Sequence, residues 1–214
     1  MEARSKQVER RSRLAKLAAL LATVMPASVA TDGLVALRPG LTGPPAELQD
    51  GDIVFRRGVD AIGRMVLSYG DRPRFSHVGM LVRDDGGTFV VHALPETSVD
   101  DGGVQLDRLG AFNSPLRAAD VGYYRVRQLS LEQRREIHRF LIAQVGRPFD
   151  LRFKYSTDDA VYCTELVLKA LAQVGVELTP TLEAIQVILV DEPVFAPDAL
   201  RQSELLQDLV STTM

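Results

Sequence analysis

The segment from residue 76 to 93 constrains the fold most, because it predicts a β-hairpin. Two runs rich in β-branched and apolar residues flank the sequence Asp84-Asp85-Gly86-Gly87, which favours a tight turn. His77 and His92 lie on opposite strands of this hairpin. With the turn centred on residues 85 and 86, His92 faces Gly79 and His77 is its diagonal neighbour, about 7–8 Å away on the same face. A loop longer by one residue would place the two rings on opposite faces.

The remaining pattern predicts an α+β fold with an antiparallel sheet, since strands come first and helices follow. Further strands are expected over 52–57 and 121–127. Helices are expected over 62–69, after the capping-box pair Ser130 and Gln133, from about Cys163 to Gly175, and after Pro197. The polar, Gly-rich stretch 96–115 is expected to be a loop, and the apolar run 183–190 fits a strand or a helix.

Composition restricts the function classes. The chain has 214 residues, 46% of them hydrophobic, which is enough to bury the core of one domain. A net charge of −3 gives no basic surface of the kind that binds nucleic acid, so no nucleic-acid partner is expected. The single cysteine excludes an internal disulfide framework and any multi-cysteine zinc site.

The N-terminal segment has the pattern of a secretory signal. Basic residues precede an apolar run from Leu17 to Met25, and small residues close it at 28–30. We therefore expect a signal peptide over 1–30, a Pro- and Gly-rich linker over 31–47, and one domain over 48–210. Such a chain would be exported to the periplasm or cell envelope. The alternative is an amphipathic helix in a cytoplasmic protein, because the leucines also follow helical spacing.

Cys163 is the candidate nucleophile, because it lies where a helix is expected to begin. The N–H groups and partial positive charge of a helix N-terminus stabilise a thiolate and can hold an oxyanion. An imidazole from His77 would lower the thiol pKa further, and His92 is placed to fix the tautomer of His77. The alternatives are a buried inert thiol, histidines that only pack, and a zinc site made by the cysteine and both histidines. Motifs of serine hydrolases, zinc proteases and nucleotide enzymes are absent from the sequence.

Four segments resemble, in order and spacing, one enzyme family. They are LQDGDIV at 48–54, FSHVGM at 75–80, GRPFD at 146–150 and YCTELV at 162–167. This pattern is similar to that of the circularly permuted NlpC-type papain-like cysteine hydrolases, the YiiX/YaeF-like group related to lecithin:retinol acyltransferase. The resemblance covers residues 48 to 207. It implies a permuted papain-like fold, in which an antiparallel, partly barrel-like sheet packs against helices.

The resemblance also implies roles for individual residues. Cys163 matches the nucleophile, His77 the general base and His92 the third, polar position. Phe149 stands where related enzymes often have tyrosine, so the hydroxyl of Tyr162 is the substitute oxyanion donor that we consider first, with that of Tyr155 as the alternative.

The expected activity is hydrolysis or acyl transfer through a thioester on Cys163. The resemblance implies an amide or ester substrate, either a cell-wall peptide or a lipid-linked compound, with no metal or organic cofactor. Peripheral association with the cell envelope would follow from export. Two other functions stay open: an inactive wall- or lipid-binding module with the same fold, and a Cys/His zinc-binding domain.

Overall fold

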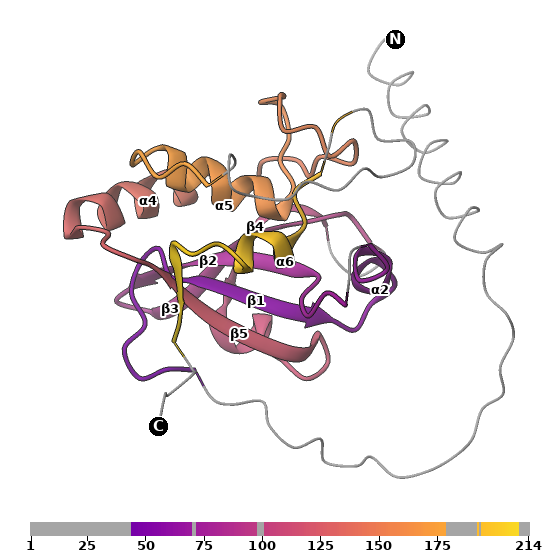
Figure 1. Ribbon diagram of the computed structural model, residues 1–214, viewed down its shortest axis with the longest axis horizontal. Helices are drawn as coiled ribbons and strands as arrows, with labels where there is room; N and C mark the ends of the chain where they lie inside the picture. Colours follow the sequence, from indigo (N-terminus) through magenta and orange to yellow (C-terminus); the bar gives the residue numbers. More distant parts are fainter. Residues whose placement is uncertain (1–43, 70–71, 98–100, 179–191, 193, 210–214) are drawn as a thin grey trace, which may run out of the picture. The chain divides into compact units, whose positions relative to one another are not determined.

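One antiparallel sheet forms the centre of the protein (Figure 1). The computed structural model describes residues 44–69, 72–97, 101–178, 192 and 194–209. The strands are β1 (Ile53–Gly58), β2 (His77–Asp84), β3 (Gly87–Leu94), β4 (Gly103–Arg108), β5 (Ala118–Val126) and β6 (Leu206–Asp208). Their order in the sheet is β4-β3-β2-β1-β5-β6, so β1 and β2 are central. The α+β class and the antiparallel sheet packed against helices are confirmed, but the sheet is open, not closed into a barrel.

Five helices accompany the sheet within the described residues. They are α2 (Ala61–Val66), α3 (Leu109–Phe112), α4 (Leu131–Gln144), α5 (Cys163–Ala172) and α6 (Pro197–Arg201). The capping box predicted for α4 is present, with Ser130 and Gln133 exchanging hydrogen bonds through their side chains and backbone N–H groups. None of the helices in these parts of the chain has the length and apolar character needed to cross a bilayer.

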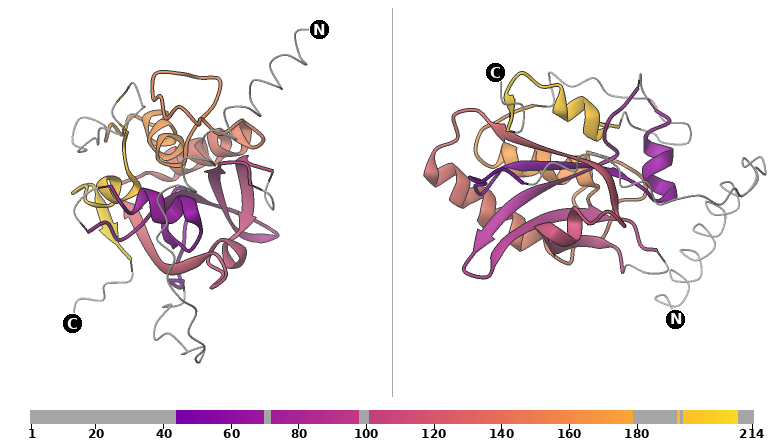
Figure 2. Two further views of the ribbon diagram at one scale, coloured as in Figure 1. Left: turned by 90° about the vertical axis from the view of Figure 1, so that its right-hand side faces the viewer. Right: turned by 90° about the horizontal axis from the view of Figure 1, so that it is seen from below.

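The two faces of the sheet bury different cores. Helices α4 and α5 lie next to each other across one face (Figures 1 and 2), where α5 packs against Val78 and Met80 of β2. Alternation along the strand sends Leu81 to the other face, where it packs with Val90 of β3 and with Phe112 of α3. His77 and Gly79 share the face of Leu81. The start of β2 therefore lies between the helix layer and the second core.

The structure corrects two parts of the sequence interpretation. The stretch 96–115 is not a continuous loop, because it contains β4 and α3. Strand β4 is an edge strand with only two apolar side chains, Val104 and Leu106, so its apolar content is too low to stand out in the sequence. Residues 206–208 pair with β5 as β6 instead of continuing the final helix. The predicted signal peptide, nearly all of the predicted linker and the apolar run 183–190 lie outside the described residues.

The predicted hairpin register is confirmed. Met80 pairs with Val91 and Asp84 with Gly87, which sets His92 across from Gly79. The two strands approach closely there, since a Cβ atom on Gly79 would lie 2.5 Å from Val90 Cγ1 and 2.9 Å from His92 Cβ. The glycine is thus required by space, because any side chain would displace His92.

Replacement of Gly79 by alanine is expected to lower the free energy of unfolding by about 1–3 kcal/mol, because the added methyl group overpacks the hairpin. Urea denaturation followed by circular dichroism measures the effect. Gly110→Ala is the matched control, since its Cβ would meet no atom within 4 Å and alanine favours the helix. Equal stabilities of the two variants would contradict the close approach.

Candidate active site

Two imidazole rings and a carboxylate form a hydrogen-bonded chain across three neighbouring strands. His77 is the first residue of β2, and its Nε2 lies 2.9 Å from Nδ1 of His92 on β3. Nε2 of His92 lies 3.2 Å from Oδ2 of Asp107 on β4. Both rings are buried, and Arg117 donates to the same Oδ2 of Asp107 at 3.4 Å. The sheet ladder thus positions every member of the chain.

The direction of these hydrogen bonds follows from the carboxylate. An ionised carboxylate only accepts, so the Nε2–H of His92 donates to Asp107. Burial is the main cause that lowers the pKa of His92, so its ring is neutral at pH 7 and its Nδ1 is an acceptor. The Nε2–H of His77 therefore donates to His92. Nδ1 of His77 is left with an unshared electron pair, which is the form a general base needs.

Arg56 and Phe112 complete the surroundings of His77. Arg56 is its register partner on β1, and the ring of Phe112 stacks on that of His77 with centroids 5.7 Å apart. Burial, the positive charge of Arg56 and the neighbouring ring of His92 hold the pKa of His77 well below its usual value. His77 is thus neutral over the physiological pH range and keeps its basic nitrogen free.

Cys163 begins α5, as predicted, and is half-buried. Burial raises the pKa of its thiol, and this effect exceeds the opposing effect of the backbone N–H groups of Val78, Thr164 and Cys163 itself. The expected lowering of the thiol pKa is therefore wrong for the free protein, because desolvation outweighs the helix N-terminus. Within the described structure the sulfur lies 4.0 Å from Oγ1 of Thr164 and makes no hydrogen bond to either histidine ring.

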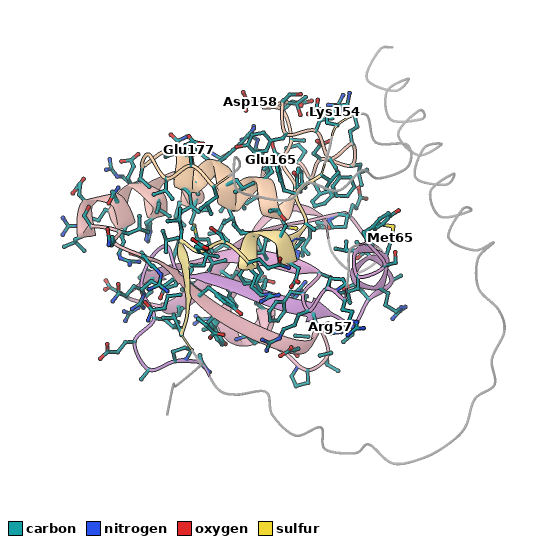
Figure 3. All side chains as sticks on the ribbon, viewed as in Figure 1. Arg57, Met65, Lys154, Asp158, Glu165 and Glu177 are labelled. Carbon is teal, nitrogen blue, oxygen red and sulfur yellow. The ribbon has the colours of Figure 1, made fainter. Side chains whose placement is uncertain are left out.

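The start of α5 is held by a buried acidic residue. Glu165 accepts the backbone N–H of Tyr162 at 3.1 Å and pairs with Lys169 at 2.9 Å. Lys169 also donates to the carbonyl of Thr157 at 2.8 Å and to Asp158 at 2.7 Å, which ties the preceding loop to the helix. Figure 3 labels Asp158 on that loop and Glu165 on α5. Burial raises the pKa of Glu165 to about 7. This network fixes the backbone from which the Cys163 side chain projects.

Two cavities lie beside these groups and share one lining residue. One, of about 70 Å³, is lined by Cys163 and by apolar side chains that include Met65 of α2, labelled in Figure 3, and Phe153. The other, of about 460 Å³, is lined by His77 and Arg56. Ser76 lines both cavities. Cys163 and His77 therefore line different cavities that have Ser76 in common.

The tyrosines of the sequence interpretation have different positions. Tyr162 lines the cavity of Cys163, and its buried hydroxyl has no hydrogen-bond partner among the described residues. Burial raises the pKa of Tyr162, so the hydroxyl keeps its proton and can donate it. Tyr155 packs against Phe195, with ring centroids 5.8 Å apart, and Phe149 forms an isolated bridge with Val161. Of the two tyrosines, Tyr162 is the one that lines the cavity of Cys163.

The sequence interpretation missed Asp107 and Arg56. Asp107 belongs to the strand taken for a loop, and eight residues separate β3 from β4, too many for turn geometry to set their register. Arg56 belongs to a predicted strand, and alternation places it on the opposite face of the sheet from Phe55. The sequence does not indicate that a charged side chain is buried on that face.

Comparisons with known proteins agree on the fold. A family model described as permuted papain-like amidase enzyme, YaeF/YiiX, C92 family, matches residues 47–210. The crystal structure of metalloprotein YiiX from Escherichia coli O157:H7 superposes with a TM-score of 0.61 at 22% identity, covering 75% of this chain and 95% of that one. That identity supports a shared fold alone. No curated protein matches the sequence.

The name of that neighbour raises the question of a metal site. Across the part of this chain that the structure describes, no group of three or more His, Cys, Asp or Glu side chains is placed to hold a metal ion. The zinc-site interpretation therefore has no ligand set in those residues, and we derive no step through a metal.

Replacement of Asp107 by asparagine is expected to change the tautomer of His77. The amide both donates and accepts, so it no longer forces Nε2–H on His92, and both rings should become tautomer mixtures. Imidazole ¹⁵N chemical shifts at pH 7 report the protonated nitrogen directly. Asp120→Asn is the control, because it removes the same charge from a pair with Arg74 outside the site. Unchanged His77 shifts in Asp107→Asn would show that the carboxylate does not set the tautomer.

The thiol of Cys163 is expected to be protonated at pH 7 in the free protein, because its pKa is raised above the usual value of about 8.5. Alkylation by iodoacetamide should therefore be slow at pH 6 to 7 and should rise with pH to a midpoint above that of N-acetylcysteine. The single cysteine makes mass spectrometry a clean readout. Rapid labelling at pH 6 would contradict the desolvated thiol.

Proposed function

The chain belongs to the C92 family of permuted papain-like amidases, and from that premise we propose that it is a cysteine hydrolase that cleaves an amide bond through a thioester on Cys163. The observation that carries the proposal is the chain from Asp107 through His92 to His77, which leaves Nδ1 of His77 as a free base at the start of β2. The backbone N–H of Val78, the residue next to that base, is one of the groups that act to lower the pKa of the Cys163 thiol.

In the first half of the reaction, Cys163 attacks the substrate carbonyl. As the S–C bond forms, Nδ1 of His77 takes the thiol proton, so the neutral pair becomes charged only when substrate is present. The side chain of Cys163 turns from Thr164 towards His77 for this transfer, since catalytic hydrogen bonds are often long before substrate binds. The backbone N–H of Cys163 and the hydroxyl of Tyr162 stabilise the oxyanion.

In the second half, His77 returns the proton to the leaving amine as the C–N bond breaks, and a thioester remains on Cys163. A water molecule then attacks the thioester while His77 takes one of its protons. Collapse of this intermediate releases the acid and restores the thiol, which recovers the proton. The relay supports each step because His92 accepts a hydrogen bond from the imidazolium as well as from the neutral ring.

The lining of the cavities supports a substrate with an apolar acyl part. The acyl group is bonded to sulfur in the thioester, so it occupies the cavity of Cys163, whose lining includes Met65, Val66 and Phe153. The predicted export of the chain would bring this site to cell-envelope peptides and lipid-linked amides, which is the substrate class that we propose. The cavity disfavours a charged acyl part, because burial of an unpaired charge is costly.

Hydrolysis should depend on Cys163. We expect the purified protein to hydrolyse some members of a panel of N-acyl amides with small apolar acyl groups, and Cys163→Ala to lower the rate at least a thousandfold by removing the nucleophile. A hydroxylamine quench followed by mass spectrometry detects the acyl-enzyme. Gln173→Ala, an exposed change at the far end of the same helix, is the control and should keep full activity.

Two results would contradict the proposal. Full activity of Cys163→Ala would exclude the nucleophile. No hydrolysis of any panel member by the folded protein, combined with tight binding, would favour an inactive binding module. Ester analogues of the same acyl groups, assayed in parallel, separate an amidase from a lipid acyl hydrolase.

A further inference from the structure

Arg56 is a buried cation without an ion-pair partner among the described residues. The residue is 4% exposed and lies in the central strand β1. Its Nη1 donates to the backbone carbonyl of Phe112 at 3.3 Å, and the guanidinium lies 4.5 Å from the centroid of the Phe112 ring. Nε is buried and has no hydrogen-bond partner in the described structure, and no carboxylate there lies within ion-pair distance of Arg56.

Such an arrangement is costly unless another group completes it. A buried charge without a partner destabilises a fold, and arginine forms its strongest hydrogen bonds with carboxylate and phosphate. The stacking on Phe112 accounts for the orientation of the side chain but does not neutralise its charge. Burial lowers the pKa of Arg56 to about 10 and outweighs the opposing effect of Asp60 and Asp107, neither of which lies within ion-pair distance, so Arg56 stays charged at pH 7. The charge therefore calls for an anion in the cavity that Arg56 lines.

The cavity lined by Arg56 is the one that also exposes His77. Among its lining residues the charged ones are Arg56, Arg117 and Asp60, so positive charge prevails. Asp60 caps α2 by accepting the backbone N–H of Gly63 at 2.6 Å, and Arg117 faces Asp107 at 3.4 Å. Both of these groups thus have partners within the protein.

The chemistry of the proposed reaction tells which part of the substrate enters this cavity. The leaving amine receives its proton from His77, so it departs through the space that His77 lines. We infer that Arg56 is a specificity residue that binds a negatively charged group, carboxylate or phosphate, on the leaving amine of the substrate. This inference rests on the proposed function for the direction in which the substrate lies, but the anion site itself can be tested without catalysis.

The test measures binding by calorimetry at pH 7 in the full chain carrying Cys163→Ala, so that ligands stay intact. Two ligand pairs differ only in the charged group: N-butanoylglycine with N-butanoylglycinamide, and N-butanoyl-phosphoethanolamine with N-butanoylethanolamine. With Arg56 present, we expect the charged member of at least one pair to bind about 10- to 100-fold more tightly than the neutral one. Comparison of the two pairs tells whether the site prefers carboxylate or phosphate.

Three variants identify the responsible cation. In Arg56→Met the ratio of the dissociation constants of the neutral and the charged ligand should fall to about one. Arg56→Lys should keep part of the preference, because the positive charge remains. Arg57→Met is the matched control, since Arg57 is the next residue on β1, exposed and outside the cavity (Figure 3), and it should leave the ratio unchanged. Circular dichroism verifies the fold of each variant.

A ratio near one with Arg56 intact would overturn the inference, and so would a preference that persists in folded Arg56→Met. If Arg56→Met does not fold, the test rests on the ratio of dissociation constants measured in two proteins, the one that keeps Arg56 and the Arg56→Lys variant. Failure of the proposed function would look different, because absent hydrolysis by the protein with Cys163 would leave the binding ratio in the Cys163→Ala background unaffected.

Discussion

The hydrogen bond between His77 and His92 is the contact on which the other features of the site depend. Two buried imidazoles can form this hydrogen bond only if the two histidines have fixed positions relative to each other along their strands, and the hairpin register fixes those positions. Gly79 lets the strands approach, and Asp107 gives the chain its direction by accepting at one end. The basic nitrogen of His77 is then determined by charge and geometry together.

Much of this arrangement could be predicted from the sequence, because it depends on local signals. The turn at 84–87 sets the register of the two histidines, and the break before Cys163 marks the start of its helix. Asp107 could not be predicted, since its strand pairs across a long connection whose register is fixed by tertiary packing. The burial of Arg56 could not be predicted. Alternation along a strand tells which face of the sheet a side chain lies on, but it does not tell which other parts of the protein cover that face.

Burial and the helix N-terminus act on the thiol in opposite directions, and burial has the larger effect. A neutral thiol is a poor nucleophile towards oxidants as well as towards substrates, so the single cysteine is protected from oxidation while the site is empty. In the proposed reaction the thiolate–imidazolium pair would then form only when substrate is bound, so that the reactivity of the thiol depends on occupancy of the site.

Arg56 and His77 are direct register partners on adjacent antiparallel strands, so the backbone ladder holds their Cα atoms about 5 Å apart. In the proposed reaction the guanidinium of Arg56 binds the anion and the imidazole of His77 protonates the amine, so the two parts of a leaving group would be bound from adjacent strands. A leaving group whose amine and anion are farther apart than these two side chains would have to bend to reach both. Chain length between amine and anion would then select leaving groups together with the identity of the anion.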